Sequence, residues 1–341
     1  MKRVKAFLVA LASSALLAGG SAGAVELKGA GATFPAPLYF NWIQSFKEAR
    51  PGDAISYDPV GSGAGIKRFL AGEVDFGASD ALMSDAQVAA VGRGAVAVPA
   101  TAGMVVVVYN LPELTAPLRL GREVLGGIFS GAITEWNDPK IAADNPGVTL
   151  PDRTIGIVVR RDGSGTTFAL TTHLSAVSEA WAASGPGVGT LVDWPGSAMT
   201  AVGNDGVAGR IRISTDSIGY VEYGYAKRLG LAMAVLENRA GSFVAPTAAA
   251  GAAALADTAD EMPADGRQLI PDPKGPDSYP IVTYSWLLLY RSYPDADLLQ
   301  ALRAFVAWGL EEGQAAAPDL GYIPLPEVVA TKSKALLATV Q

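Results

Sequence analysis

The chain has 341 residues, one histidine, no cysteine and a formal net charge of −7. Without cysteine the fold depends on its core alone, and the His and Cys clusters that hold zinc are missing. An acidic chain also lacks the basic face that usually marks a nucleic-acid-binding protein, so we expect no nucleic-acid partner.

The N-terminal segment is typical of a secretory signal peptide. Lys2, Arg3 and Lys5 precede an apolar run from Ala6 to Ala18, and small residues follow as far as Ala24. The apolar run is shorter than the roughly 17–25 residues that span a bilayer. We therefore predict that residues 1–24 are a signal peptide cleaved near Ala24. Its removal would change the formal charge from −7 to −10.

Beyond this segment, short apolar runs alternate with amphipathic helical patterns. The runs that predict strands are residues 55–60, 103–110, 155–159, 218–222 and 281–290. Helices are predicted where apolar residues recur every three or four positions, at Tyr39, Trp42, Ile43 and Phe46 and again at Leu298, Leu302, Phe305 and Val306. This alternation predicts an α/β fold with largely parallel sheets. About 317 residues after cleavage are more than one core usually supports, which favours two lobes.

Two segments late in the chain carry no functional pattern. Residues 245–266 are rich in alanine and low in complexity, which predicts a surface helix with loops. Residues 272–280 are dense in Pro, Gly and Asp and predict a loop before the last long strand.

Four loops share one design, in which Gly, Ser and Thr lie between an apolar strand and the start of a helix. They are GAGATFPAP (29–37), GSGAGIKRF (61–69), DFGASDALMSD (75–85) and VVRRDGSGTTF (158–168). Helix starts leave backbone N–H groups free, and these groups can bind an anion. One such loop is usually only a turn with an N-cap, but four together indicate an anion site. The second loop lacks the GxxxxGK[ST] spacing, so we exclude a nucleotide-binding loop.

The polar side chains in these loops suit an oxyanion that still carries a proton. Thr33 and Ser62 supply hydroxyl groups, and an arginine of the fourth loop can place two N–H groups on a tetrahedral anion. Asp80 would repel an anion unless the ligand has a proton to donate to it. Asp162 could orient an arginine, cap the helix or stay in solvent.

Together with GNDGVAG (203–209) and IGYVEYGYAK (218–227), these motifs resemble those of the periplasmic phosphate-binding proteins of bacterial Pst-type ABC transporters, in order and at similar intervals. The resemblance runs from Gly29 to about Pro326 and is weakest between Met233 and Gly275. It implies a two-lobe periplasmic-binding-protein fold of type II-like topology, in which each lobe is a mixed β-sheet flanked by helices and the ligand lies between the lobes. Lobe I would be residues 25–107 and 282–341, and lobe II residues 108–281.

The resemblance also implies a set of phosphate-binding residues: Thr33, Phe34, Ser62, Asp80, Arg160, Asp162, Ser164, Gly165 and Thr166. Phe34 would contribute its amide, and Asp162 would pair with the arginine. The family pattern is Arg, any residue, Asp, Gly, Ser, Gly, which selects Arg160 and not Arg161. Family members often have a lysine just before GNDG, where this chain has Val202, so we assign no site residue there.

The function implied is high-affinity phosphate binding in the periplasm and delivery to the permease subunits of an ABC importer, by a monomer without cofactor, metal or enzymatic activity. A binder of another tetrahedral oxyanion and an adhesin on the same fold remain alternatives. A hydrolase built around Ser164 is a third, although the only histidine, His173, lies on the same predicted helix and is poorly placed to serve as its base.

Overall fold

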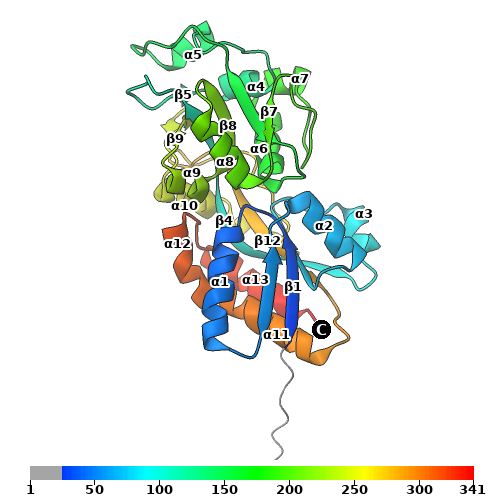
Figure 1. Ribbon diagram of the computed structural model, residues 1–341. Coiled ribbons are helices and arrows are strands. Elements are labelled where there is room, and N and C mark those ends of the chain that lie inside the picture. The colour runs from blue at the N-terminus through cyan, green and yellow to red at the C-terminus, as the bar shows by residue number, and fades with distance from the viewer. Residues whose placement is uncertain (1–24) are drawn as a thin grey trace, which may run out of the picture.

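The computed structural model describes residues 25–341, and the predicted signal peptide lies outside the described residues. Figure 1 shows two lobes, one holding the first strands and the C-terminal helices and the other holding the middle of the chain. None of the helices within residues 25–341 has the length and apolar character needed to cross a membrane.

One sheet of nine strands runs through both lobes. Its order is β2 (Ala54–Asp58), β1 (Glu26–Gly31), β3 (Phe76–Ser79), β12 (Val282–Tyr290), β4 (Ala95–Asn110), β8 (Ser217–Glu222), β6 (Gly156–Arg160) and β7 (Met199–Ala201), with β9 (Ala232–Met233) also paired to β4. A small second sheet contains β11 (Phe243–Val244), β10 (Val235–Glu237) and β5 (Arg119–Leu120). All five strands predicted from apolar runs are present.

The expectation of largely parallel sheets is wrong for the two longest strands. The outer pairs β1–β2, β1–β3, β6–β7 and β6–β8 are parallel. However, β12 is antiparallel to both of its neighbours, β3 and β4, and β4 is antiparallel to β8. The reason is topological: β4 leads the chain out of lobe I, and the chain returns into lobe I at β12, so the two strands run in opposite directions. The mixed sheets implied by the family resemblance are confirmed.

The link between the lobes is a single continuous strand. β4 pairs with β12 as far as Met104 and with β8 from Val105 onward. The returning chain lies beside it, because the N–H of Val105 donates to the carbonyl of Ile281 at 2.9 Å. The two crossings are therefore adjacent, as a hinge between two lobes requires.

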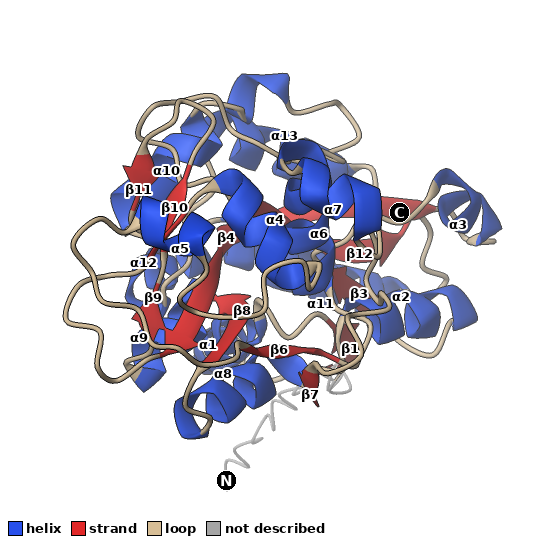
Figure 2. Cartoon of the chain, turned by 90° about the horizontal axis from the view of Figure 1, so that it is seen from above, coloured by secondary structure: helices blue, strands red, loops and turns tan. Residues whose placement is uncertain are grey.

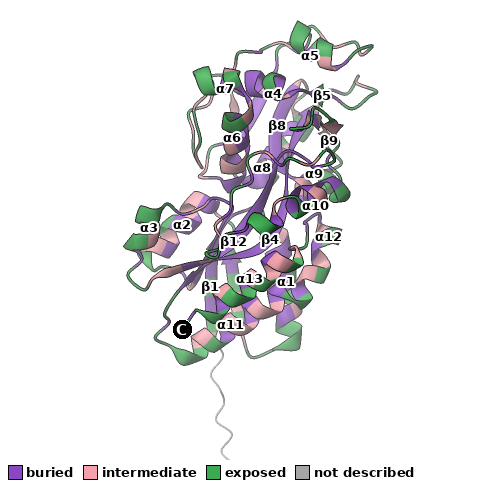
Figure 3. Cartoon of the chain, turned by 180° about the vertical axis from the view of Figure 1, so that it is seen from behind, coloured by how far each residue is buried: buried purple, intermediate pink, exposed green. Residues whose placement is uncertain are grey.

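Helices cover the sheet (Figure 2). The two predicted amphipathic helices are α1 (Ala36–Ala49) and α11 (Ala296–Leu310), and Trp42 and Phe305 are among their buried residues. The others are α2 (Ser62–Ala71), α3 (Asp85–Ala90), α4 (Arg122–Phe129), α5 (Pro139–Asp144), α6 (Gly165–Val177), α7 (Glu179–Ser184), α8 (Gly203–Ile213), α9 (Tyr223–Leu229), α10 (Ala248–Ala256), α12 (Ala317–Leu320) and α13 (Glu327–Ala338). Figure 3 shows that the buried residues concentrate in the strands and on the inner faces of these helices.

The alanine-rich segment forms α10, as predicted, and the chain after it packs onto lobe I. Trp286 Nε1 of β12 donates to the carbonyl of Gly266 at 2.7 Å, and Lys332 Nζ of α13 donates to the carbonyl of Met262. Residues 272–280 form a loop.

Candidate anion-binding site

The four Gly-rich loops meet where the two lobes touch. The N–H of Gly63 in lobe I donates to the carbonyl of Gly163 in lobe II at 2.9 Å. A Cβ added at Gly165 would lie 2.5 Å from Ser62 Oγ and 2.5 Å from Asp80 Cβ, so only glycine permits this close approach. The structure thus brings residues 33–34, 62 and 80 together with residues 160–166.

Thr33 and Phe34 connect the end of β1 to the start of α1. Their own N–H groups make no hydrogen bond with any residue from 25 to 341. The carbonyl of Thr33 accepts from Tyr225 Oη at 2.8 Å, and that of Phe34 accepts from Tyr322 Oη at 2.7 Å. The backbone is thereby fixed through its carbonyls while its amides remain available as donors.

Asp80 is almost fully buried at the end of β3, with 1% of its surface exposed. Its Oδ1 accepts from Ser285 Oγ at 2.7 Å, and Ser62 Oγ accepts from its N–H at 3.1 Å. Burial raises the pKa of the Asp80 carboxyl to about 7, although the hydrogen bond from Ser285, the charge of Arg160 and the hydrogen bond from Ser62 oppose this rise.

Arg160 ends β6 and is 2% exposed. Its Nε donates to Asp162 Oδ1 at 2.7 Å, and its Nη2 donates to Asp162 Oδ2. Burial alone would raise the pKa of Asp162, but the hydrogen bonds and charge of Arg160 and the N–H of Gly203 hold it below its ordinary value. The third nitrogen, Arg160 Nη1, is buried without a hydrogen-bond partner among residues 25–341. Arg161 is exposed.

Helix α6 begins directly after this arginine. Ser164 is its N-cap, and Ser164 Oγ accepts from the N–H of Thr167 at 3.1 Å. The N–H groups of Gly165 and Thr166 belong to the first turn, which has no intrahelical acceptors. The partial positive charge of the helix N-terminus thus lies beside the guanidinium of Arg160.

Asn204, in the GNDG motif, is a buried site residue that sequence reasoning missed. Its Nδ2 donates to Thr33 Oγ1 at 3.0 Å and to Thr166 Oγ1 at 3.2 Å, one hydroxyl from each lobe. Its Oδ1 accepts from the N–H of Glu222 at 2.9 Å, which fixes the amide orientation. A hydroxyl that accepts from Asn204 keeps its own proton for another acceptor. The motif was visible in the sequence, but the lysine that often precedes it is Val202 here, so no role was assigned.

Ser285 is a second missed residue. It lies in the fully buried strand β12 and holds Asp80 from 205 positions further along the chain. Nothing in an apolar strand signals such a contact.

The arrangement does not suit a serine hydrolase. His173 is buried, and its Nδ1 lies 2.8 Å from the carbonyl oxygen of Pro271. Burial lowers its pKa to about 4. Within the described part of the chain no hydrogen bond joins His173 to Ser164, and no group of three His, Cys, Asp or Glu residues could hold a metal ion.

Comparison with known proteins defines first the class and then the family. A model of the PBP superfamily domain matches residues 18–310. The phosphate-binding protein PstS of Pasteurella multocida is 41% identical over 313 residues, which cover 92% of this chain and 90% of the relative. The PstS of Haemophilus influenzae is 39% identical over 308 residues, covering 90% and 91%. The chain belongs to the PstS family of phosphate-binding proteins.

Solved structures agree on the fold. A high affinity periplasmic phosphate-binding protein bound with phosphate superposes with a TM-score of 0.73 at 23% identity, covering 93% of each chain. A phosphate-binding protein from Stenotrophomonas maltophilia superposes with a TM-score of 0.73 at 21% identity, covering 91% of this chain and 93% of that one.

Proposed function

We propose that this protein binds inorganic phosphate between its lobes in the periplasm and delivers it to the permease subunits of an ABC phosphate importer. The observation that carries the proposal is the buried, unpartnered Arg160 Nη1 beside the free N–H groups at the start of α6. A buried donor without a partner costs about 1–3 kcal/mol, and a bound oxyanion would remove that cost.

In this proposal each lobe contributes donors to one tetrahedral anion. Lobe I supplies the hydroxyls of Thr33 and Ser62 and the amide of Phe34. Lobe II supplies the guanidinium of Arg160, oriented by Asp162, and the three donors that open α6: Ser164, Gly165 and Thr166. In this proposal the protein works as a monomer and as a binding protein, with Ser164 Oγ serving as the N-cap of α6, where it accepts from the N–H of Thr167.

Asp80 accounts for selectivity. Phosphate near neutral pH carries a proton that a carboxylate can accept, whereas sulfate carries none. The pKa of about 7 means that Asp80 is mostly ionised only above neutral pH. Below that pH the protonated carboxyl could donate to sulfate. We therefore expect discrimination against sulfate to be strongest above pH 7 and to decline as the pH falls.

Phosphate should close the two lobes around itself. The donors lie on both lobes, so the ligand binds the closed form better and shifts the population toward it. We place the hinge near residues 107–110 and 281–283, where the chain crosses between the lobes, and β4 changes partners close by, at Met104 and Val105. We propose that lobe I is residues 25–107 and 282–341, with residues 248–270 moving with it. Small-angle scattering should show a smaller radius of gyration with saturating phosphate, and identical curves would contradict closure.

Titration calorimetry tests the ligand assignment. The dialysed protein should bind phosphate tightly and sulfate far more weakly. Arsenate is titrated as a third anion. Equal binding of sulfate and phosphate would favour a general oxyanion binder. Turnover of a chromogenic phosphate ester that is abolished by Ser164→Ala would favour a hydrolase.

A further inference from the structure

Lobe I contains a cavity of about 410 Å³ outside the anion-binding site. Its floor is formed by β4 and β12, where Ala97 lies opposite Leu288 and Ala95 lies two residues earlier on the same face. Short alanine side chains on one strand leave space that a larger residue would fill. The cavity is therefore a consequence of the sequence of β4.

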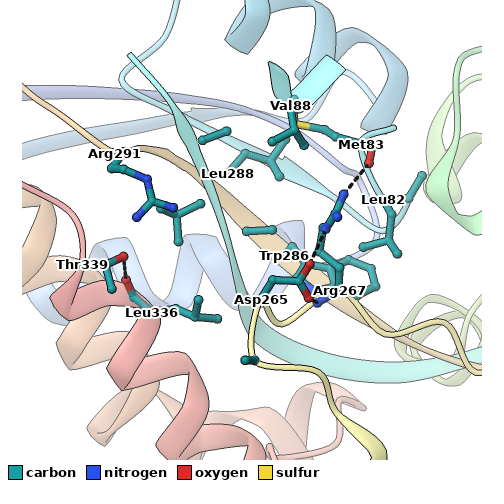
Figure 4. A pocket seen from close by; sticks show the side chains of 15 residues that line it. Leu82, Met83, Val88, Asp265, Arg267, Trp286, Leu288, Arg291, Leu336 and Thr339 are labelled. Carbon is teal, nitrogen blue, oxygen red and sulfur yellow. Dashed lines mark hydrogen bonds and ion pairs between the residues drawn. The ribbon is translucent and has the colours of Figure 1, made fainter. Parts of the chain in front are cut away.

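The walls of the cavity are mostly apolar. Leu82, Met83 and Val88 close one side, Leu336 of α13 lies across from them, and Trp286 borders the floor (Figure 4). Buried apolar surface favours a hydrocarbon over water, and a volume of several hundred Å³ is that of a small-molecule site.

Two arginines line opposite sides of the cavity (Figure 4). Arg267 is neutralised, because its guanidinium donates to Asp265 at 2.9 Å and to Asp85 at 2.8 Å. The side chain of Arg291 has no hydrogen bond or ion pair with any residue between 25 and 341. The cavity thus combines an apolar interior with one uncompensated positive charge at its wall.

We propose that this cavity is a second binding site, for an amphipathic carboxylate with a medium-length hydrocarbon chain. The hydrocarbon fills the apolar interior, and the carboxylate pairs with the fork of N–H groups on Arg291. A water molecule occupies roughly 30 Å³ in the liquid, so the cavity has room for about a dozen groups of that size. Decanoate, with ten carbons and a carboxylate, matches both the volume and the charge.

The experiment is calorimetric titration of the full protein with decanoate in the presence of saturating phosphate. Phosphate occupies the cleft, so decanoate cannot compete for Arg160. We expect saturable binding at one site, no binding of acetate, and weaker binding of octanoate by roughly fifteenfold, because octanoate lacks two methylenes and each buried methylene contributes a factor of about four.

Two variants and a matched control locate the site. Arg291→Ala should weaken decanoate binding at least about tenfold, as expected for a hydrogen bond to a charged group. Ala97→Phe should abolish it by filling the floor. Lys334→Ala removes an equal charge from α13 that pairs with Glu311 outside the cavity, and should leave decanoate binding unchanged.

The proposal is overturned if the parent protein gives no saturable heat with decanoate, or if Arg291→Ala binds decanoate as tightly as the parent. Because Arg291 is exposed, its replacement leaves the core intact and keeps the test valid even if Ala97→Phe fails to fold.

Discussion

The candidate anion-binding site has two walls, one from each lobe, and each wall contains a buried ionisable group of opposite charge: Asp80 in lobe I and Arg160 in lobe II. In lobe I the buried carboxyl of Asp80 is held by a neutral hydroxyl, because Ser285 Oγ donates to Oδ1 at 2.7 Å, while Ser62 Oγ lies 3.4 Å from Oδ2. In lobe II the buried guanidinium of Arg160 is held by a full negative charge, on Asp162. Burial raises the pKa of Asp80 to about 7, because the hydroxyls and the more distant charge of Arg160 do not offset it, whereas burial of Asp162 is outweighed by the hydrogen bonds and charge of Arg160, so the pKa of Asp162 is lowered.

This difference assigns separate tasks to the walls. Asp162 occupies two nitrogens of Arg160 and leaves the third for an anion, so lobe II provides attraction. Among residues 25–341 no cation contacts Asp80 directly, so in the proposed complex its negative charge would act on the ligand itself, and lobe I would provide discrimination. If Asp80 discriminates between anions and Arg160 attracts them, changes at Asp80 should alter which anion binds, and changes at Arg160 should alter how tightly any anion binds.

The largest expected effect is on the affinity for sulfate. At pH 8 the ionised Asp80 faces sulfate with no proton between them, and sites built for a ligand hydroxyl can reject analogues without it by about ten-thousandfold. Asp80→Asn should accept sulfate better than the parent does, because its amide can donate as well as accept. Paired calorimetric titrations of both proteins with both anions measure this.

The titrations with sulfate and phosphate can also contradict the proposed role of Asp80 in selectivity. Parent protein that binds sulfate within about tenfold of phosphate, a gap of about 1.4 kcal/mol, would remove both the role of Asp80 and the phosphate assignment.

The raised pKa of Asp80 predicts the next largest effect, on stability without ligand. Between pH 3.8 and about 7 the unfolded chain has lost the Asp80 proton and the folded chain retains it. The unfolding free energy should therefore fall as the pH rises through this window, by about 4 kcal/mol. The asparagine of Asp80→Asn does not titrate, so the unfolding free energy of this variant should not show the fall that Asp80 causes.

Chemical denaturation of parent and Asp80→Asn across pH 4 to 8 isolates the effect. Burial raises the pKa of Glu222 to about 8, so Glu222 also lowers the unfolding free energy as the pH rises. His173, whose pKa is lowered by burial to about 4, acts in the other direction: it raises the unfolding free energy as the pH rises toward 6.5. The contribution of His173 is the same in the two proteins and cancels in the difference. That of Glu222 cancels except for the part caused by the charge of Asp80, which is the smallest of the causes that shift its pKa. Parallel stability curves would mean that Asp80 does not titrate as its burial requires.

Arg160→Ala should weaken phosphate binding by about 1.5–3 kcal/mol, the scale of a hydrogen bond to a charged group. It should weaken sulfate binding to Asp80→Asn by a similar amount, because attraction is not selective. The matched control is Arg161→Ala, which removes an exposed guanidinium one residue away and should change little. If Arg161→Ala weakens binding more than Arg160→Ala in calorimetry, the ligand-binding arginine is Arg161 and our choice of Arg160 is wrong.

Much of the candidate site could be proposed from the sequence, because most of its residues lie in short local motifs. Each loop that holds Thr33, Ser62 or Ser164 combines its own Gly and hydroxyl residues with its own helix start, so a short motif carries the signal. Asn204 and Ser285 were not found, because their roles exist only when distant segments pack together. The direction of β4 and β12 was missed for the same reason: an apolar run predicts a strand but not its partner.

The smallest expected effect comes from Asn204, which touches both walls. Its Nδ2 donates to the hydroxyls of Thr33 and Thr166 and so leaves their protons for phosphate. The Thr166 hydroxyl lies 3.5 Å from Asn204 Oδ1, which is too far for a good O–H···O bond to compete. Asn204→Ala should weaken phosphate binding by about 1 kcal/mol, or about fivefold, as the hydroxyls lose this orientation.

Asn204→Asp separates this orienting role from simple packing. The carboxylate still accepts from the N–H of Glu222, so it should preserve stability better than Asn204→Ala, which leaves that N–H unpaired. In binding the order should reverse, because the carboxylate accepts the protons of Thr33 and Thr166 and adds negative charge beside the anion. Thermal unfolding without ligand and phosphate titration on both variants give the two rankings. If the variant that loses more stability also loses more affinity, Asn204 serves only as packing between the lobes.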